Sequence, residues 1–350
     1  MTFFHYFILS CFNSKKAMRT TTLYHLLKGK RTSSILSYSY FYEVLPFFSL
    51  FPKLNETQYN QVISSLINEN YLIQTEPNYV EISSTGINAL ENITLPEIAN
   101  LNQLAYYKWD MAFFERVVFT TQVLSEKAYS NSHYLPIETN LFRQQRLKQW
   151  LNKQSESVAM AFYKEWDALI NSLPQPSHEL ILGQLVGNNH RGRTLQQLAD
   201  SYEEDVIFTY VEFKNYWHAL ITLVLEATGE FPLFNSLINE ERLLVKEDSY
   251  KQSADLFHQG YDVDGISRIR QLKNSTVTDH LIEEFIVTHE LANIPDFSEE
   301  VRNGLNQLLS QKSEYVRWSY KEATEFVPSL SFYEFKFYQF YLVEKERAND

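Results

Sequence analysis

The stretch from Gly260 to Leu281 reads GYDVDGISRIRQLKNSTVTDHL, and its spacing predicts a helix-turn-helix. A first helix over about 249–259 is expected to end at Gly260, because glycine tolerates the left-handed conformation that often closes a helix. Asp262 is expected to cap the second helix, and Asn274 or Ser275 the third. The side chains predicted to point inward are Val263, Ile266 and Ile269 from the second helix, Leu272 from the turn, and Val277, Leu281 and Phe285 from the third.

The third helix is the candidate recognition helix, whose first residues would reach base edges or the sugar-phosphate backbone of DNA. Its polar side chains and two arginines of the second helix are the candidate DNA contacts here: Arg268, Arg270, Lys273, Asn274, Ser275, Thr276 and Thr278.

The same module is acidic, which limits what it can do alone. Residues 249–288 carry four Lys/Arg against six Asp/Glu, a balance of −2, and both Asp279 and Glu283 lie where they would repel phosphate. Phosphate neutralisation supplies most non-specific DNA affinity, so binding is expected to be weak or dependent on a partner. A helix-turn-helix that serves only as a packing or protein-docking unit is the alternative.

At these residues the sequence resembles known families. The pattern resembles the LuxR-type and sigma-factor-type motif. Its features are a glycine, a short helix that contains Ile266, then Leu272, and then the run from Thr276 to Leu281. More closely, Ser249–Leu281 resembles the helicase-associated helix-turn-helix domain at the C-terminus of some bacterial RecQ helicases. The whole chain resembles the YpbB-like family of low-GC Gram-positive bacteria, in which the segment TLYHLLKGK, here residues 22–30, is also typical. These resemblances imply a non-catalytic protein that is linked to a RecQ-type DNA helicase and binds DNA. No cofactor is expected.

Length and composition predict a folded, mostly helical chain. With 350 residues it is long enough for three domains, expected at 1–95, 96–232 and 233–350. A hydrophobic fraction of 44% excludes a disordered chain, and only 9 Gly and 10 Pro favour long helices over a turn-rich β-sandwich. The fold class expected is all-α with a small β wing.

Charge is unevenly distributed along the chain. The first 60 residues hold seven Lys/Arg against two Glu, a net charge of +5. Because the whole chain has a net charge of −12, the other 290 residues carry −17. Lys15, Lys16 and Arg19 are the candidate DNA contacts of this basic end. A continuous basic stripe joining them to Arg143, Arg146 and Lys148, or to Arg268 and Lys273, would favour DNA, whereas scattered positive charges would favour a protein scaffold.

Residues 1–95 predict a winged helix. Helices are expected near 3–12, 20–28 and 33–48, and another begins at Asn55, which can cap it while Gln58 reaches back. Extended segments at 71–74 and 79–82 give a hairpin, the wing, before a last short helix that opens at Thr85. The helix after Asn55 contains no Lys or Arg, and its polar residues suit a protein partner at least as well as DNA. Those residues are Asn60, Gln61, Ser64, Ser65 and Asn68.

Residues 96–232 predict a helical middle region that breaks at 173–176. Its helices are expected over roughly 101–128, 139–152, 155–173, 178–187, 194–203 and 207–227. Thr194 and Gln197 form a capping box that could open a second, degenerate helix-turn-helix. The next helix is rich in Tyr and Trp, which favours core packing instead.

Other patterns favour neither an enzyme nor a metal site. The run Gly187–Thr194 resembles a P-loop, but Arg193 replaces the lysine and no strand precedes it, so a loop between helices is expected. His289-Glu290 lacks the second histidine of a zinc protease, and one cysteine with nine dispersed histidines predicts no metal cluster. His280 is expected to be structural. We therefore expect a non-enzyme.

Both ends of the chain are apolar. Phe3–Phe12 resembles a signal peptide but lacks a preceding basic residue and a cleavage site, so a buried first helix is expected. No apolar run approaches the roughly 18–20 residues that cross a membrane. The single Cys11 fits a reducing compartment, so a cytoplasmic location, with the bacterial nucleoid as a variant, is expected. The last helix opens with a capping box at Ser331 and Glu334 and must be buried, preferentially against its own domain.

Three functions remain open at this level. The first is an accessory or regulatory factor for a RecQ-type helicase that contacts DNA or the helicase through the C-terminal helix-turn-helix. The second is a scaffold that docks protein partners through its winged modules. The third, a transcriptional regulator, would require dimerisation and a palindromic site.

Overall fold

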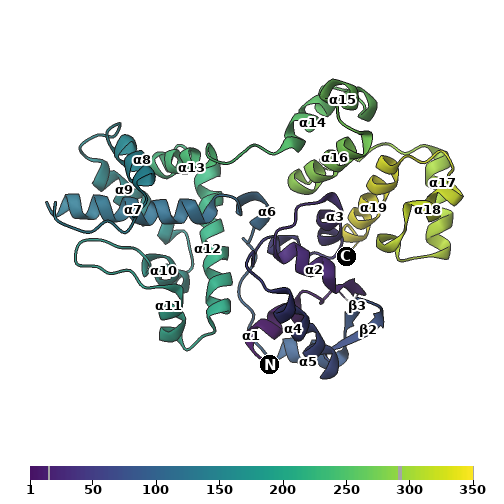
Figure 1. Cartoon of the computed structure of the whole chain (residues 1–350), viewed down its shortest axis with the longest axis horizontal. Coiled ribbons are helices and arrows are strands. Elements are labelled where there is room, and N and C mark those ends of the chain that lie inside the picture. The colour runs from purple at the N-terminus through teal and green to yellow at the C-terminus, as the bar shows by residue number, and fades with distance from the viewer. Residues whose placement is uncertain (15, 291–293, 350) are drawn as a thin grey trace. The chain divides into compact units, whose positions relative to one another are not determined.

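The computed structural model describes residues 1–14, 16–290 and 294–349, and within them it is predominantly helical, as predicted. Nineteen α-helices and a three-stranded sheet are found in this part of the chain (Figure 1). The chain divides into two compact units. One consists of Met1–Asn13, Asn60–Ile73 and Ile82–Lys246, and the other of Ser14–Tyr59, Gln74–Glu81 and Glu247–Asp350.

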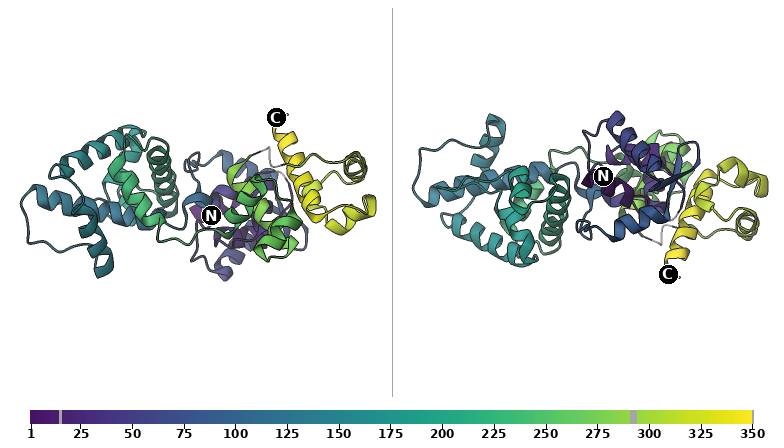
Figure 2. Two further views of the ribbon diagram at one scale, coloured as in Figure 1. Left: turned by 90° about the horizontal axis from the view of Figure 1, so that it is seen from above. Right: turned by 90° about the horizontal axis from the view of Figure 1, so that it is seen from below.

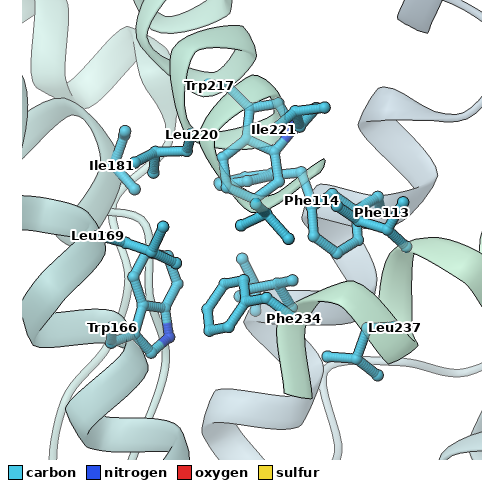
Figure 3. Packing of buried hydrophobic residues seen from close by; sticks show 14 of the residues in the cluster. Phe113, Phe114, Trp166, Leu169, Ile181, Trp217, Leu220, Ile221, Phe234 and Leu237 are labelled. Carbon is cyan, nitrogen blue, oxygen red and sulfur yellow. The ribbon is translucent and has the colours of Figure 1, made fainter. Parts of the chain in front are cut away.

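The first unit contains the helical middle region. Its helices are α1 (Phe3–Ser10), α5 (Ser84–Glu91), α6 (Gln103–Tyr106), α7 (Asp110–Ala128), α8 (Leu141–Leu151), α9 (Val158–Asn171), α10 (Gln175–Leu182), α11 (Leu195–Tyr202), α12 (Val206–Glu226) and α13 (Pro232–Arg242). Helices α10 and α11 lie along α12, whereas α9 and α13 lie along α7 (Figures 1 and 2). Between them lies an aromatic core built around Phe113, Trp217 and Phe234 (Figure 3).

Helix α13 belongs to this core. Phe234, Leu237 and Ile238 are buried in it, and Phe162 stacks on Phe234 at 4.9 Å between ring centroids. The sequence division had placed residues from 233 onward with the C-terminal region, but these side chains pack with the middle helices. The three expected domain ranges remain a prediction about independent folding.

The expected helix over 101–128 is interrupted. Asn102 caps α6, which ends at Tyr106, and α7 begins only at Asp110. The buried Asp110 is the first residue of α7, and Trp217 Nε1 donates to its carbonyl oxygen at 3.0 Å. The capping box of Thr194 and Gln197 is confirmed at the start of α11.

Helix α1 confirms the expected buried first helix. Phe7, Ile8 and Leu9 are buried, and α1 packs against α5 and α12. No helix in the described ranges combines the length and apolar character needed to cross a membrane.

The second unit brings together early and late parts of the chain. It contains β1 (Met18–Arg19), α2 (Thr20–Leu27), α3 (Ser33–Phe41), a 3-10 turn (Leu45–Phe47), α14 (Ser249–His258), α15 (Val263–Arg270), α16 (Asn274–Thr288), α17 (Glu299–Gln311), a second 3-10 turn (Tyr315–Arg317), α18 (Tyr320–Phe326) and α19 (Phe332–Arg347). Three elements run across the division between the units: α4 (Glu56–Asn68), β2 (Leu72–Glu76) and β3 (Tyr79–Ile82).

The expected wing is confirmed as the hairpin of β2 and β3, and β1 pairs with β3 in the sheet order β1-β3-β2. Asn55 caps α4 as predicted, with its side-chain oxygen accepting from the backbone of Thr57 at 2.9 Å. The expected helix over 33–48 is too long, since α3 ends at Phe41. Glu43 adopts a left-handed conformation, and a short 3-10 turn with Pro46 at its second position follows, so the helix cannot continue.

The C-terminal helix-turn-helix is present as α14, α15 and α16. Gly260 has φ +92°, Asp262 caps α15 through the backbone of Gly265 at 2.7 Å, and Ile266 is fully buried, all as predicted. Two details differ. Helix α16 begins at Asn274 after Lys273, which offers no capping side chain, and Ile269 is 52% exposed because it lies on the outer side of α15.

Candidate nucleic-acid interface

Helix α16 packs its first face against the rest of the helix-turn-helix. Val277, Leu281 and Phe285 are buried, as predicted, and α16 lies against α14 and α15. His280 Nδ1 lies 2.9 Å from Ser253 Oγ on α14. Burial lowers the pKa of His280, and the nearby Arg270 acts in the same direction. His280 is therefore a structural residue of this contact.

A second face of α16 is also covered. Asp279, Ile282, Glu283 and Ile286 recur at i, i+3, i+4 and i+7, which places them on one stripe of the helix. We call these four residues the α16 stripe. Ile282 and Ile286 are buried, and α16 packs here against α3, as Figure 1 shows. In a DNA-bound helix-turn-helix the outward stripe of the third helix faces the major groove.

The polar half of the α16 stripe is paired with residues just before and within α3. Ser33 Oγ donates to Asp279 Oδ1 at 2.5 Å, and Arg31 Nε donates to Glu283 Oε1 at 2.7 Å. Arg31 also lies 3.4 Å from the carboxylate of Asp248. From the sequence these acidic residues are expected to repel phosphate. Instead they hold the chain's own N-terminal segment.

Aromatic contacts of Phe285, from the first face of α16, also reach α3 and α19. Tyr40 of α3 lies 5.8 Å from the ring of Phe285, and Phe340 of α19 lies 4.8 Å from it. Phe41 and Phe340 are 5.0 Å apart. Helix α19 is thus buried within its own unit, as predicted, and the recognition helix lies beneath both α3 and α19.

Two of the predicted contact residues are held inside the fold. Thr278 is only 3% exposed, so its hydroxyl does not reach a surface. The Arg270 guanidinium donates to Ser253 Oγ at 2.5 Å and to the Ser249 carbonyl at 2.8 Å, which ties α15 to α14. Both side chains therefore make contacts within the helix-turn-helix.

The N-terminal turn of α16 remains open. Lys273, Asn274 and Ser275 are exposed and Thr276 is half-buried. Asn274 Nδ2 donates to Asp264 Oδ1 at 2.5 Å, so a carboxylate lies beside this turn. Arg268 is exposed on α15, with its Nε donating to the Asp264 carbonyl. This turn is the part of the motif that DNA can reach.

The predicted residues of the basic end have different surroundings. Lys15 lies outside the described residues. Lys16 pairs with Glu346 at 2.9 Å. Arg19 is exposed, with its guanidinium 5.1 Å from the ring centroid of Tyr79.

The arginines proposed for a basic stripe in the first unit are also paired. Arg143 pairs with Glu138 at 3.3 Å as well as with Glu115, and Arg146 pairs with Glu241 at 2.9 Å. Lys148 is exposed. Two of these three positive charges are thus paired with carboxylates, and scattered charge is the pattern that favours a scaffold.

The Gly187–Thr194 run is a loop between α10 and α11, as expected, closed by a pair of hydrogen bonds between Gly187 and His190. No group of metal-ligating side chains was found in the described part of the chain.

The first unit also holds a buried charged cluster that the sequence analysis did not identify. Asp110 accepts from Lys214 and lies 2.9 Å from His218 Nε2, and all three are at most 2% exposed. Burial would raise the pKa of Asp110, but the hydrogen bond from His218 and the charge of Lys214 hold it below its ordinary value. The cluster joins α7 to α12 in the core.

A set of exposed lysines lies outside the contacts predicted from the sequence. Lys28, Lys30 and Lys53 are exposed in the second unit, although none was among the candidate contacts. The signal was present in the +5 balance of the first 60 residues and in the segment TLYHLLKGK.

Comparisons with known proteins agree with the helix-turn-helix. Residues 249–339 match a family model described as a helix-turn-helix domain. The chain is similar to Protein YpbB of Bacillus subtilis (strain 168), with 21% identity over 336 residues that cover 89% of this chain and 95% of that protein. No solved structure matches the chain.

Proposed function

We propose that this protein is a non-catalytic, DNA-associated accessory or regulatory factor for a RecQ-type DNA helicase. The observation that carries the proposal is the C-terminal helix-turn-helix, whose third helix keeps its N-terminal turn exposed. The first turn of a recognition helix supplies many of the contacts to DNA, and phosphates are favoured at helix N-termini. The resemblance of residues 249–281 to a helicase-associated domain supports the choice of partner.

The covered stripe restricts how DNA is held. Because α3 occupies the outward face of α16, the helix cannot lie along the major groove in this form. Contact through α16 is limited to Lys273 and the three residues after it, which bring one positive charge. We therefore expect weak, sequence-independent binding that falls steeply with salt.

A protein scaffold is the second candidate, and the same covered stripe favours it. A helix-turn-helix whose outward face already holds α3 acts as a protein-docking module within its own chain. Such a module suits a factor whose main contact is with the helicase rather than with DNA.

One experiment separates the two functions. Binding of the full chain to duplex, forked and single-stranded DNA is measured between 50 and 200 mM salt, beside pull-down of a RecQ-type helicase. Salt-dependent DNA binding together with helicase capture supports the accessory factor. Helicase capture without DNA binding at the lowest salt supports the scaffold, and loss of both overturns the proposal.

A further inference from the structure

Three lysines in the second unit lie on two adjacent turns and have exposed side chains. Lys28 and Lys30 flank Gly29 at the end of α2, and Lys53 lies in the turn before α4. We call these three residues the lysine surface.

Hydrogen bonds hold the two turns together. The backbone of Ser49 donates to the Leu26 carbonyl at 2.8 Å, and that of Phe51 donates to the Leu27 carbonyl at 2.9 Å. A further bond from Leu54 to the Phe51 carbonyl at 3.0 Å closes a tight turn, with Lys53 at its tip.

The first turn is rigid because of Gly29. Gly29 has φ +81°, and the backbone of Lys30 donates to the His25 carbonyl at 2.9 Å, which is the pattern of a helix-closing glycine. A Cβ at this glycine would lie 2.5 Å from Ser49 Oγ, so no other residue fits against the second turn. The lysines are therefore presented from a fixed backbone.

Charge distinguishes these lysines from the other basic residues of the segment. Lys16 and Arg31 are paired with carboxylates, whereas no ion pair is recorded for Lys28, Lys30 or Lys53 in the described ranges. Lys28 lies 5.8 Å from the ring centroid of Tyr24, and burial together with Lys30 and Lys28 lowers the pKa of His25. Glu56 acts on His25 in the opposite direction, and it is an acidic neighbour of this group of three lysines.

We infer that Lys28, Lys30 and Lys53 form a phosphate-contacting surface that holds the backbone of DNA independently of its sequence. This inference rests on the proposed DNA association and gives it a location other than α16. Lysines act as point charges toward phosphate and carry no base information, so the contact positions the chain on DNA.

The surroundings favour DNA over an acidic protein. Protein interfaces depend on buried aromatic or aliphatic anchors. The exposed residues around Lys53 are Pro52, Asn55, Glu56, Thr57 and Gln58, and none of them is a large hydrophobic residue. Helix α4 begins three residues after Lys53, and the Glu56 carboxylate in its first turn offsets part of the positive charge of this helix end.

The test compares two triple variants of the full chain that lose the same charge. One is Lys28→Gln, Lys30→Gln and Lys53→Gln. The control is Lys148→Gln, Lys153→Gln and Lys164→Gln, at exposed lysines of the first unit. A third variant replaces the lysine surface by arginine, which keeps the charge.

We expect the first variant to lose about tenfold or more in duplex affinity at 50 mM salt, and its salt slope to fall by about 3 units. The control should stay within about twofold of the unaltered chain, and the arginine variant should keep binding. Thermal melts confirm that all variants are folded.

Two results would overturn the inference while leaving DNA association intact: equal losses in both glutamine variants, or unaltered binding in the first. If the first variant binds DNA normally but no longer captures the helicase, the surface contacts protein instead. Absence of DNA binding by the unaltered chain at low salt removes the DNA association itself, and this inference with it.

Discussion

Helices α16 and α4 are the two candidate recognition helices of this chain, and they differ in what covers them. Helix α16 matches the motif, yet it buries residues on two faces. Helix α4 has no motif and no Lys or Arg, yet it buries Tyr59, Val62 and Leu66 on one face and leaves its polar face exposed. A motif identifies how three helices pack, whereas the residues on the outward stripe decide whether the surface is open.

The largest effect is expected from removing the apolar part of the α16 stripe. Ile286 is fully buried, so Ile286→Ala should lower the free energy of unfolding by about 2–5 kcal/mol. Gln61→Ala on the exposed face of α4 is the control and should stay within about 0.5 kcal/mol. Urea unfolding of the full chain measures both. Equal, small effects would show that the α16 stripe is open and would break the comparison.

Asp279→Lys is the next test. From sequence alone this change was expected to strengthen DNA binding by removing repulsion at the recognition helix. Because Asp279 accepts from Ser33, we now expect it to destabilise the fold by about 1–3 kcal/mol. Asp255→Lys makes the same change of charge at an exposed position of α14 and should be nearly neutral. A stable Asp279→Lys variant with tighter DNA binding would contradict the covered stripe.

Lys336 of α19 gives the interface a pH dependence. Burial lowers its pKa to about 8, against the opposing effect of Asp279. The unfolded chain keeps this proton up to the ordinary lysine range, so between about pH 8 and 10 the unfolded state binds more protons and stability rises with pH. The gain should be on the order of 1–3 kcal/mol. Lys336→Met should remove this part of the pH dependence in urea unfolding at pH 7.5 and 9.5. An unchanged dependence would mean that Lys336 is hydrated.

A smaller effect tests the turn between α14 and α15, where Gly260 lies. Gly260 and Gly229 both have open space where a Cβ would lie, but only Gly260 has a positive φ, of +92°. Gly260→Ala should therefore cost about 1 kcal/mol, whereas Gly229→Ala should cost little or stabilise. Thermal melts compare the two. Equal shifts would mean that backbone strain does not set the end of α14.

The helix-turn-helix could be predicted because its signals are local. Gly260, Asp262 and Ile266 each act on neighbours within a few residues, and all three behave as expected. The wing and the caps at Asn55 and Thr194 were predictable for the same reason.

The covering of α16 could not be predicted from the same sequence. Ser33 and Asp279 are 246 residues apart, and nothing in either segment identifies the other as its partner. The stripe itself was visible, since Ile282 and Ile286 are poor residues for a surface that faces DNA. That α3 covers these residues could not be predicted, because the sequence does not show which helix packs against the α16 stripe.

The smallest effect concerns the open end of α16. Lys273 is exposed before the first turn and brings the one positive charge of that turn, with Asp264 held nearby by Asn274. If DNA reaches this turn, Lys273→Gln should flatten the salt slope by about one unit and weaken binding to all sequences alike. Lys251→Gln, at an exposed position of α14, is the matched control.

The lysine surface sets the scale for that result. Replacing the three lysines of the lysine surface should lower the salt slope of DNA binding about three times as much as replacing Lys273 does. A ratio near three would indicate that DNA contacts both the lysine surface and the helix-turn-helix. A Lys273 effect no larger than that of Lys251 would confine DNA to the lysine surface and leave the helix-turn-helix as a docking unit. A Lys273 effect larger than that of the whole lysine surface would reverse the comparison, because the covered helix would then carry most of the DNA contact.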